Sequence, residues 1–234
     1  MMHEEVIEKI TLKLREYLGN KKAIIGVSGG IDSAVVAALC VRAVGKENVL
    51  GILIPYGAQS TEDGKLVTDY LGIENKEINI KEIVDKFNYF KFDKVSLGNI
   101  MARTRMIILY SFANQLNGIV VGTSNKTEIE IGYFTKYGDG GCDIEPIADI
   151  YKTKIFEVAK ILGIPKKIID RKPSAELFEG QTDEGEIGAS YKEIDAVLNG
   201  EITKGKVYDA IQNRVRYSEH KRKMPPTFYV REEK

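Results

Sequence analysis

A glycine-rich turn between two apolar segments is the feature that most limits how this chain can fold. Residues 26–33 read Gly-Val-Ser-Gly-Gly-Ile-Asp-Ser, after the apolar run 23–25 and before the apolar stretch 34–44. This pattern predicts a buried strand that enters a tight turn and then a helix. Backbone N–H groups of the turn and the helix N-terminus would face one small volume, which suits an anion such as phosphate.

The turn matches neither of two common phosphate-binding patterns. No Lys-Ser/Thr pair closes a Gly-x-x-x-x-Gly spacing, and the Gly-x-Gly-x-x-Gly spacing of dinucleotide folds is absent. Ser-Gly-Gly-x-Asp-Ser instead resembles the pyrophosphate loop of the ATP-pyrophosphatase superfamily, whose members activate an oxygen by transferring AMP to it. A turn that binds nothing is the alternative, and Asp32 would then serve only the dipole of its helix.

Strand-like and helix-like segments alternate through the first half of the chain. Strands are predicted at 22–27, 48–55, 76–80 and 118–122, and helices at 31–44, 60–71, 83–90 and 99–117. This order predicts an α/β fold with right-handed crossovers: a doubly wound, open parallel sheet, Rossmann-like, with helices on both faces. Ligands of such sheets bind beyond the carboxyl ends of the strands, so the turn at 26–33 and the segment after Gly122 should converge.

The second half of the chain is richer in glycine and loops. Helices are predicted over 151–162, 187–198 and 206–215, and an amphipathic helix over 1–18 begins the chain. Residues 172–188 hold proline, serine, glycine and five acidic residues, which predicts an exposed loop. We see no repeat and no linker, so we expect a single domain over residues 1–234.

Charge and cysteine content argue against several classes of function. Lys plus Arg and Asp plus Glu both number 34, so no global basic field points to nucleic acid or a membrane surface. Cys40 and Cys142 stand far apart, which argues against a zinc site, a redox pair and a disulfide framework. No apolar run reaches the length of a membrane span, and the start of the chain does not resemble a signal peptide. We expect a cytoplasmic protein.

A second acidic residue is placed to reach the glycine-rich turn. Glu128 follows Thr123 on the segment that leaves the 118–122 strand. It could supply a second Mg²⁺ ligand beside Asp32, because Mg²⁺ commonly takes one or two carboxylates together with phosphate oxygens and waters. A solvated carboxylate at a helix start is the alternative.

Two further segments carry charged residues in unusual settings. Residues 133–141 read Tyr-Phe-Thr-Lys-Tyr-Gly-Asp-Gly-Gly, which places Lys136 and Asp139 in a glycine-bracketed loop. An Ω-type structural loop is the alternative. Arg103 and Arg105 lie on an otherwise apolar helix, where surface ion pairing is the alternative to ligand binding.

Together these motifs resemble ammonia-dependent NAD⁺ synthetase. Segments 26–33, 98–106, 122–128, 132–143, 146–152 and 173–184 stand in the order of that family, and the resemblance runs from about residue 20 to 222. It implies an adenine nucleotide alpha hydrolase-like fold and a carbon–nitrogen ligase. That enzyme would amidate deamido-NAD⁺ (nicotinic acid adenine dinucleotide) with ammonia and ATP, through an adenylated carboxylate, and would release NAD⁺, AMP and pyrophosphate.

The resemblance also implies roles for single residues. ATP would be bound by Gly26, Val27, Ser28, Gly29, Gly30, Ile31, Asp32, Ser33, Thr123, Lys152 and Ser174. Deamido-NAD⁺ would be bound by Arg103, Lys136, Asp143, His220 and Lys221, with a solvated residue of the tail as the alternative for His220. Asp32 and Glu128 would hold Mg²⁺. Lys152 would also be catalytic, since it would meet the charge that develops on phosphate. From its carboxylate and its glycine-rich setting we expect Asp139 to be catalytic as well, taking a proton from ammonium.

The chain departs from the family pattern at two adjacent positions and from some members in length. Ser124-Asn125 stand where many bacterial relatives carry Asp-His. Other relatives carry an N-terminal glutaminase domain, whereas only about two dozen residues precede the first strand here, fewer than a domain needs. We therefore expect no glutaminase domain and free ammonia as the donor, with a separate glutaminase partner left open. The resemblance also implies a homodimer whose deamido-NAD⁺ site lies at the subunit boundary.

Two other functions would also account for the glycine-rich turn. Another activating enzyme, such as a tRNA-thiolating enzyme or the synthetase half of GMP synthetase, would share the glycine-rich turn. Thiolation usually needs catalytic cysteines and a basic RNA surface, and neither is evident here. A non-catalytic ATP-sensing domain would need the turn but has no use for two metal carboxylates together with Lys136, Asp139 and Lys152.

Overall fold

The computed structural model describes residues 2–174, 182–228 and 230. In this part of the chain the strands form one parallel four-stranded sheet in the order β3-β2-β1-β4. The strands are β1 (Lys22–Gly26), β2 (Val49–Leu53), β3 (Glu74–Glu77) and β4 (Gly118–Val120). The direction of strand order reverses between β1 and β4, which is the switch point of a doubly wound sheet. The predicted fold class is confirmed.

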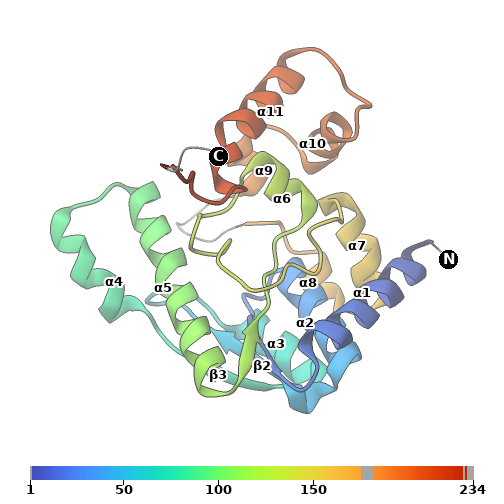
Figure 1. The fold of residues 1–234 in the computed structure, drawn as a ribbon, viewed down its shortest axis with the longest axis vertical. Coiled ribbons are helices and arrows are strands. Elements are labelled where there is room, and N and C mark those ends of the chain that lie inside the picture. Colours follow the sequence, from blue (N-terminus) through green and yellow to red (C-terminus); the bar gives the residue numbers. More distant parts are fainter. Residues whose placement is uncertain (1, 175–181, 229, 231–234) are drawn as a thin grey trace.

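Helices cover both faces of the sheet (Figure 1). One face carries α1 (Met2–Leu18), α2 (Ile31–Val44), α3 (Glu62–Leu71), α7 (Lys152–Ile161) and α8 (Lys166–Ile169). The opposite face carries α5 (Lys94–Gln115), on which α4 (Lys81–Phe87) packs. Short 3₁₀ helices lie at Lys46–Asn48, Asn88–Phe90 and Glu219–Lys221. Among the described helices, none combines the length and the apolar composition needed to cross a membrane.

Successive side chains of the inner strands enter two different cores. Ala23 and Ile25 pack with residues of α1, α2 and α7, whereas Ile24 packs with Leu50 and Ile52 against α5. All five of these side chains are at most 1% exposed. Because neighbouring residues of a strand point to opposite faces, a continuous apolar run suits only a strand that is covered on both sides.

The remaining helices form a separate group at the top of Figure 1. They are α6 (Lys126–Ile131), α9 (Asp183–Ile187), α10 (Tyr191–Leu198) and α11 (Lys206–Tyr217). A small core of its own holds this group together, with Ile131, Ile187, Ile194 and Ile211 buried. The group therefore stands beyond the sheet and forms one wall of the space above the strands.

The long helix α5 begins earlier than the apolar periodicity predicts. The prediction placed its start at residue 99, but the helix begins at Lys94. The side chain of Asp93 accepts a hydrogen bond from the backbone nitrogen of Ser96 at 2.7 Å and so caps the helix. The cap stabilises a first helical turn that the apolar periodicity alone does not predict.

The predicted helix over 187–198 begins four residues later in the structure: α10 starts at Tyr191, and Ile187 belongs to the preceding short helix α9. Gly188 has a φ of +84°, a left-handed conformation that ends α9. Ser190 and Glu193 then form a capping box that begins α10 at Tyr191. The predicted loop 172–188 is correct only in part, because α9 lies within it. Residues 175–181 of that loop lie outside the described residues.

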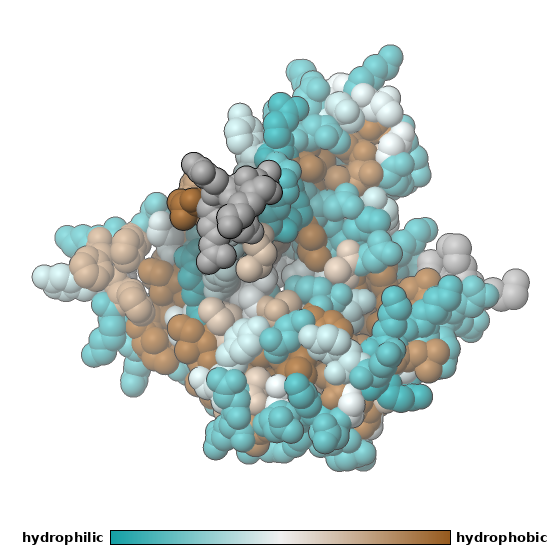
Figure 2. All heavy atoms as spheres, in the orientation of Figure 1, coloured by the Kyte–Doolittle hydropathy of each residue, from teal (hydrophilic) through white to brown (hydrophobic). Residues whose placement is uncertain are grey.

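Apolar side chains gather at the left edge of the molecule, over α4 and the start of α5 (Figure 2). Tyr89, Phe90 and Val95 are 84%, 67% and 68% exposed. An exposed apolar cluster of this kind often marks a contact with another molecule.

The turn after β1 packs closely on the first turn of α3. Gly29 has a φ of +82°, and a methyl group there would lie 2.6 Å from Asp63 Cβ and 2.8 Å from the backbone nitrogen of Gly64. The side chain of Asp63 is also held by Lys167 at 2.7 Å and by Arg171 at 3.3 Å. The turn can take this path only with glycine at position 29.

We predict that Gly29→Ala lowers the free energy of unfolding by about 2–4 kcal/mol, from the positive φ and the clash together. Gly19→Ala is the matched control, because Gly19 also has a positive φ, +53°, but open space around it. It should cost only about 1–2 kcal/mol. Urea unfolding of both variants checks this, and equal losses would contradict the close approach.

Candidate active site

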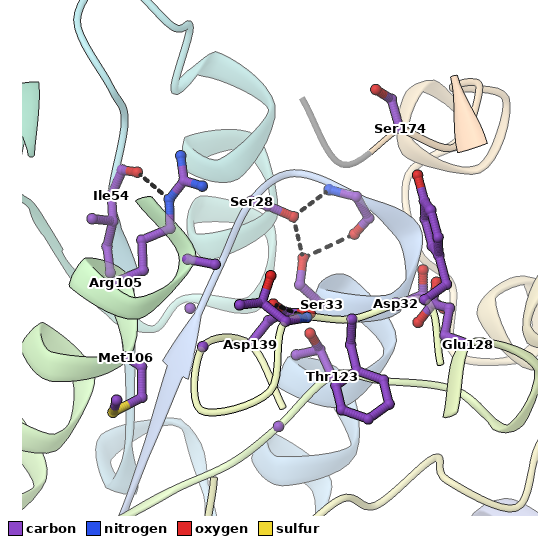
Figure 3. A pocket seen from close by; sticks show the side chains of 18 of the residues that line it. Ser28, Asp32, Ser33, Ile54, Arg105, Met106, Thr123, Glu128, Asp139 and Ser174 are labelled. Atoms are coloured by element: carbon purple, nitrogen blue, oxygen red, sulfur yellow. Dashed lines mark hydrogen bonds between the residues drawn. The ribbon is translucent and has the colours of Figure 1, made fainter. Parts of the chain in front are cut away.

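A cavity of about 530 Å³ opens at the carboxyl ends of β1, β2 and β4 (Figure 3). Of the residues that the sequence assigns to ATP, these line it: Gly26, Val27, Ser28, Gly30, Ile31, Asp32, Ser33, Thr123, Lys152 and Ser174. Glu128 and Asp139 line it as well. The volume lies in the range of roughly 300–1,000 Å³ that is usual for ligand pockets. The predicted convergence of the turn with the segment after Gly122 is confirmed.

The glycine-rich turn is held by its own hydroxyl groups. The backbone nitrogen of Gly30 donates to Ser28 Oγ at 3.2 Å, and Ser33 Oγ donates to the carbonyl oxygen of Gly30 at 3.0 Å. The two hydroxyl oxygens lie 3.3 Å apart. Gly30 is the N-cap of α2 and has no side chain to cap it, so the N–H groups of the first turn are left to a ligand.

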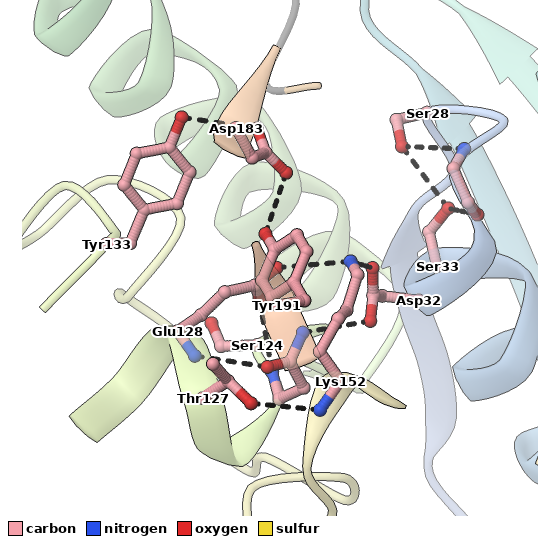
Figure 4. A network of polar contacts seen from close by, with 12 residues as sticks. Ser28, Asp32, Ser33, Ser124, Thr127, Glu128, Tyr133, Lys152, Asp183 and Tyr191 are labelled. Atoms are coloured by element: carbon pink, nitrogen blue, oxygen red, sulfur yellow. Dashed lines mark hydrogen bonds and ion pairs between the residues drawn. The ribbon is translucent and has the colours of Figure 1, made fainter. Parts of the chain in front are cut away.

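Lys152 is the central charged group of the site (Figure 4). Its side chain is 3% exposed, and its ammonium contacts the Asp32 carboxylate and lies 3.4 Å from Glu128 Oε1. Burial alone lowers the pKa of Lys152, but the charges of Asp32 and Glu128 outweigh burial and raise this pKa above its usual value. Burial raises the pKa of Glu128, an effect that Lys152 opposes and Asp32 reinforces. The three groups therefore form one buried cluster that keeps its cation charged.

Asn125 connects the two carboxylates. Its Oδ1 accepts from the backbone nitrogen of Glu128 at 3.1 Å, and its own backbone nitrogen donates to Glu128 Oε2 at 3.2 Å, which forms the capping box of α6. Its Nδ2 donates to Asp32 Oδ1 at 3.0 Å. Asn125 is fully buried, and these bonds satisfy its amide. The departure from the family pattern at this position thus supplies a direct link between Glu128 and Asp32.

Asp32 and Glu128 offer carboxylate oxygens to a divalent cation. Both side chains line the cavity, and they are 16% and 15% exposed. Among the described residues there is no cluster of three or more His, Cys, Asp or Glu side chains that could hold a metal. A cation here would therefore complete its shell with oxygens from a ligand and from water, as Mg²⁺ does beside a nucleotide. The donor set fits Mg²⁺.

Asp139 projects into the same cavity and is exposed there. Its Oδ1 accepts from the backbone nitrogen of Thr135 at 3.0 Å, which orients the carboxylate. Desolvation by the surrounding protein raises the pKa of Asp139 above its usual range, although the group itself stays open to the cavity. Lys221 lines the cavity too, and its ammonium donates to the carbonyl oxygens of Gly132 and Phe134, both at 2.7 Å.

Arg103, Lys136 and His220 do not line the cavity. They form a connected group at the surface instead. Arg103 is exposed and donates to the carbonyl oxygen of Lys136 at 3.4 Å, and the ammonium of Lys136 donates to the carbonyl oxygen of His220. Of the five residues predicted to bind deamido-NAD⁺, Lys221 alone lines the cavity.

Asp143 and Gly29 also lie apart from the cavity lining. The Asp143 carboxylate accepts from Tyr110 Oη at 3.0 Å and from the backbone nitrogen of Val120 at 2.8 Å, so it is engaged in fixing the end of β4. Gly29 faces α3, as described above. The sequence alone could not separate residues that shape the turn from residues that face a ligand.

Three residues of one polar wall were not predicted as site residues. Tyr133 Oη donates to Asp183 Oδ1 at 3.2 Å, and Tyr191 Oη donates to Asp183 Oδ2 at 2.8 Å (Figure 4). The ring of Tyr191 lies 5.1 Å from the Lys152 ammonium nitrogen. Asp183 stands in a segment that contributed to the family resemblance but had no assigned role. The sequence did not indicate a site role for Tyr191, because a tyrosine on an apolar helix face is typical of a core residue.

Arg105, which shares its helix with Arg103, was also not predicted as a site residue. Its Nε donates to the carbonyl oxygen of Ile54 at 3.0 Å, and its guanidinium reaches Gln59 Oε1 at 3.1 Å (Figure 3). It lines the cavity, whereas Arg103 does not. Residues two apart on a helix point in nearly opposite directions, so the pair could not both face one site.

Comparison with known proteins identifies the family of the chain. The family model for NAD synthase matches residues 3–225 of the chain. The chain belongs to the NAD synthase family. The NH₃-dependent NAD⁺ synthetase of Thermococcus kodakarensis is 48% identical over 95% of this chain and 96% of that protein. The family predicted from the sequence is confirmed.

Two solved structures of the same fold are similar over their whole length. NMN synthetase from Francisella tularensis superposes with a TM-score of 0.91 at 38% identity, and covers 96% of this chain and 98% of that one. NH₃-dependent NAD synthetase from Campylobacter jejuni superposes with a TM-score of 0.84 at 34% identity, and covers 98% and 100%.

We predict that Lys152→Met lowers the free energy of unfolding by about 2–3 kcal/mol at pH 8, because two carboxylates are then left without their cation. The loss should shrink at pH 5, where Glu128, whose pKa is raised, takes up a proton. The Lys152 contribution is itself present across this pH range, since its raised pKa keeps it charged until well above neutrality. Urea unfolding at both pH values measures this.

The control for this prediction is Lys166→Met. Lys166 pairs with Asp170 in an exposed i,i+4 arrangement, which should contribute little. A loss for Lys152→Met that matched this control, or that grew at pH 5, would contradict the buried cluster.

Proposed function

We propose that this chain converts deamido-NAD⁺, ATP and ammonia to NAD⁺, AMP and pyrophosphate through an adenylated carboxylate. The observation that carries the proposal is the position of Lys152 between Asp32 and Glu128, beside a glycine-rich turn in one cavity. This arrangement offers oxygens to a metal–nucleotide complex and a buried cation to phosphate. Membership of the NAD synthase family supports the reaction.

In the first step, a carboxylate oxygen of the nicotinate group attacks the α-phosphorus of ATP. The bond from the α-phosphorus to the bridging oxygen breaks, and pyrophosphate leaves with the electron pair. Residues of the turn from Gly26 to Ser33, with Thr123 and Ser174, bind and align ATP, and the Lys152 ammonium offsets the charge that develops on phosphate. Mg²⁺ held by Asp32 and Glu128 would supply further neutralisation of the phosphates.

In the second step, ammonia attacks the carbonyl carbon of the mixed anhydride, and AMP leaves. Most ammonia at neutral pH is ammonium, so a base must remove a proton before attack. Asp139 takes this role: its carboxylate lies in the cavity, Thr135 orients it, and its raised pKa makes it a better proton acceptor than an ordinary aspartate. The cavity limits the access of water, which would otherwise hydrolyse the anhydride.

The remaining part of the proposal concerns the dinucleotide. We assign deamido-NAD⁺ binding to Arg103, Lys136, Asp143, His220 and Lys221, in a homodimer whose binding site lies at the subunit boundary. The position of Arg103, Lys136 and His220 outside the cavity of one chain supports a site that a second chain completes. The exposed apolar side chains at residues 89, 90 and 95 offer a surface for such a contact. A single domain and a cytoplasmic location stay predictions.

Amidation of nicotinic acid mononucleotide is a second candidate function. It is favoured by the similarity to the Francisella tularensis protein, which is named NMN synthetase. Both reactions use the same chemistry at the carboxylate, so the turn and the Lys152 cluster do not distinguish them. Incubation of the purified chain with ATP, Mg²⁺ and ammonium chloride, with each nucleotide in turn, decides between them by the amide product formed. No amide from either substrate would overturn the proposal.

We predict that Asp32→Ala lowers kcat/KM for NAD⁺ formation at least about 100-fold, because it removes a metal ligand and one carboxylate of the Lys152 cluster. Circular dichroism should show a folded protein. Asp149→Ala, at an exposed carboxylate, is the control and should be as active as the unaltered chain. Substantial Mg²⁺-dependent activity in Asp32→Ala would contradict the assignment.

We predict that Asp139→Asn lowers the ammonia-dependent rate about 10²- to 10⁴-fold at pH 7, as loss of a general base does. Adenylation should continue, since the proton transfer belongs to the second step. The measurement is NAD⁺ formation set against exchange of labelled pyrophosphate into ATP without ammonia. The defect should shrink at higher pH, where more ammonia is unprotonated. An unchanged ammonia-dependent rate would exclude the role.

A further inference from the structure

A buried carboxylate on the helical group contacts both elements that carry the charged cluster. Asp195 lies on α10 and is 4% exposed. One of its oxygens accepts from the hydroxyl of Thr127 on α6, and the other accepts from the backbone nitrogen of Thr153 on α7 at 3.0 Å. These partners lie 68 and 42 residues away in the sequence. Neither the motifs nor the proposed mechanism gives Asp195 a role.

Both partners of Asp195 are direct neighbours of active-site residues. Thr127 precedes Glu128, and Thr153 follows Lys152. Thr127 Oγ1 also accepts from the backbone nitrogen of Lys152 at 2.9 Å. Thr127 is fully buried and Lys152 nearly so. Hydrogen bonds therefore run without interruption from Asp195 through Thr127 to the backbone of Lys152.

The same helix touches Lys152 at its other end. Tyr191 lies four residues before Asp195, so the two share one face of α10. The Tyr191 ring lies 5.1 Å from the Lys152 ammonium nitrogen, and its hydroxyl donates to Asp183 at 2.8 Å. Through Tyr191 this helix face lies beside the charged tip of Lys152 (Figure 4), and through Asp195 it holds the backbone of the next residue, Thr153.

The choice of a carboxylate at position 195 needs a reason beyond packing. A buried charge costs free energy unless hydrogen bonds and nearby dipoles compensate it, and an apolar side chain would fill the space at less cost. Here the hydrogen bonds and the N-terminal end of α7 compensate the charge. The carboxylate joins α10 to both α6 and α7 and so fixes the positions of these three helices relative to one another.

We propose that Asp195 is a positioning residue for the reaction. It fixes the start of α7 against α6 and thereby holds the Lys152 ammonium at the place where phosphate charge develops. This inference rests on the proposed function, because its readout is adenylation of a nicotinate carboxylate.

The primary test is Asp195→Asn in the full chain. The amide keeps the size of the side chain but has one acceptor oxygen in place of two, so it cannot accept from both Thr127 and Thr153 as the carboxylate does. We expect kcat for NAD⁺ formation to fall about 10- to 100-fold, because small misplacements of a catalytic group have effects of this order. KM for ATP should stay within about threefold, since the interaction matters most in the transition state. A rise in KM with unchanged kcat would overturn the proposal.

Glu193→Ala is the matched control. Glu193 lies on the same helix and closes its capping box, but it touches neither Thr127 nor α7. It should lower the thermal stability of the protein and leave kcat nearly unchanged. If both variants lowered kcat equally, loosening of α10 alone would explain the effect and the proposal would fail.

A double-mutant cycle tests whether Asp195 acts through Lys152. In a Lys152→Met background, Asp195→Asn should lower the remaining rate of pyrophosphate release less than about threefold, because the group that it positions is already gone. An undiminished loss in that background would show that Asp195 acts by another route.

A second pair of variants covers the case in which Asp195→Asn does not fold. Thr127→Val keeps the shape of the side chain and removes the hydroxyl that joins Asp195 to Lys152, whereas Thr127→Ser keeps the hydroxyl. We expect the kcat loss in Thr127→Val and near-normal kcat in Thr127→Ser. Equal kcat in these two folded variants would overturn the proposal. The unaltered chain distinguishes failure of the two proposals. If it forms no amide, the proposed function is wrong. If it forms the amide, the variants test only the role of Asp195.

Discussion

The structure above the sheet depends on the buried contact of one cation with two carboxylates. Lys152 comes from the start of α7, Asp32 from the first turn of α2 and Glu128 from the first turn of α6. Each of these groups would be costly to bury alone, and together they keep the lysine charged. The contact therefore requires three helix starts to meet at one point, and the surrounding elements are arranged to bring this about.

The sheet and the helical group contribute to this meeting in different ways. The sheet places the turn after β1 next to the segment after β4, because the strand order reverses between them. The helical group supplies the opposite wall: the Tyr191 ring lies beside the Lys152 ammonium and its hydroxyl donates to Asp183, while Asp195 accepts from the backbone nitrogen of Thr153. A rigid polar surround of this kind is what phosphate chemistry requires, since preorganised charges need not rearrange as the reaction proceeds.

Much of the fold could be predicted because its signals are local. The apolar runs of β1 and β2 and the glycine-rich turn define strand, turn and helix within a few residues. Predictions were wrong where a single residue decides a boundary: Asp93 starts α5 five residues before the predicted position, and Gly188 ends α9, so that α10 starts four residues after the predicted position. The apolar periodicity of a helix extends over a turn or more, so it does not reveal a single capping residue.

The sequence by itself determined the fold class, the family and the residue types that form the cluster, because each depends on residues adjacent in the chain. Tertiary structure alone decided that Arg105 and Asp183 face the cavity and Arg103 does not, and that Tyr191 lies beside Lys152. It also decided that Asn125 bonds to Asp32, 93 residues away, and that Asp195 reaches α6 and α7. Such contacts depend on the packing angle of one element on another, which is set by the whole core and is not encoded in any short segment.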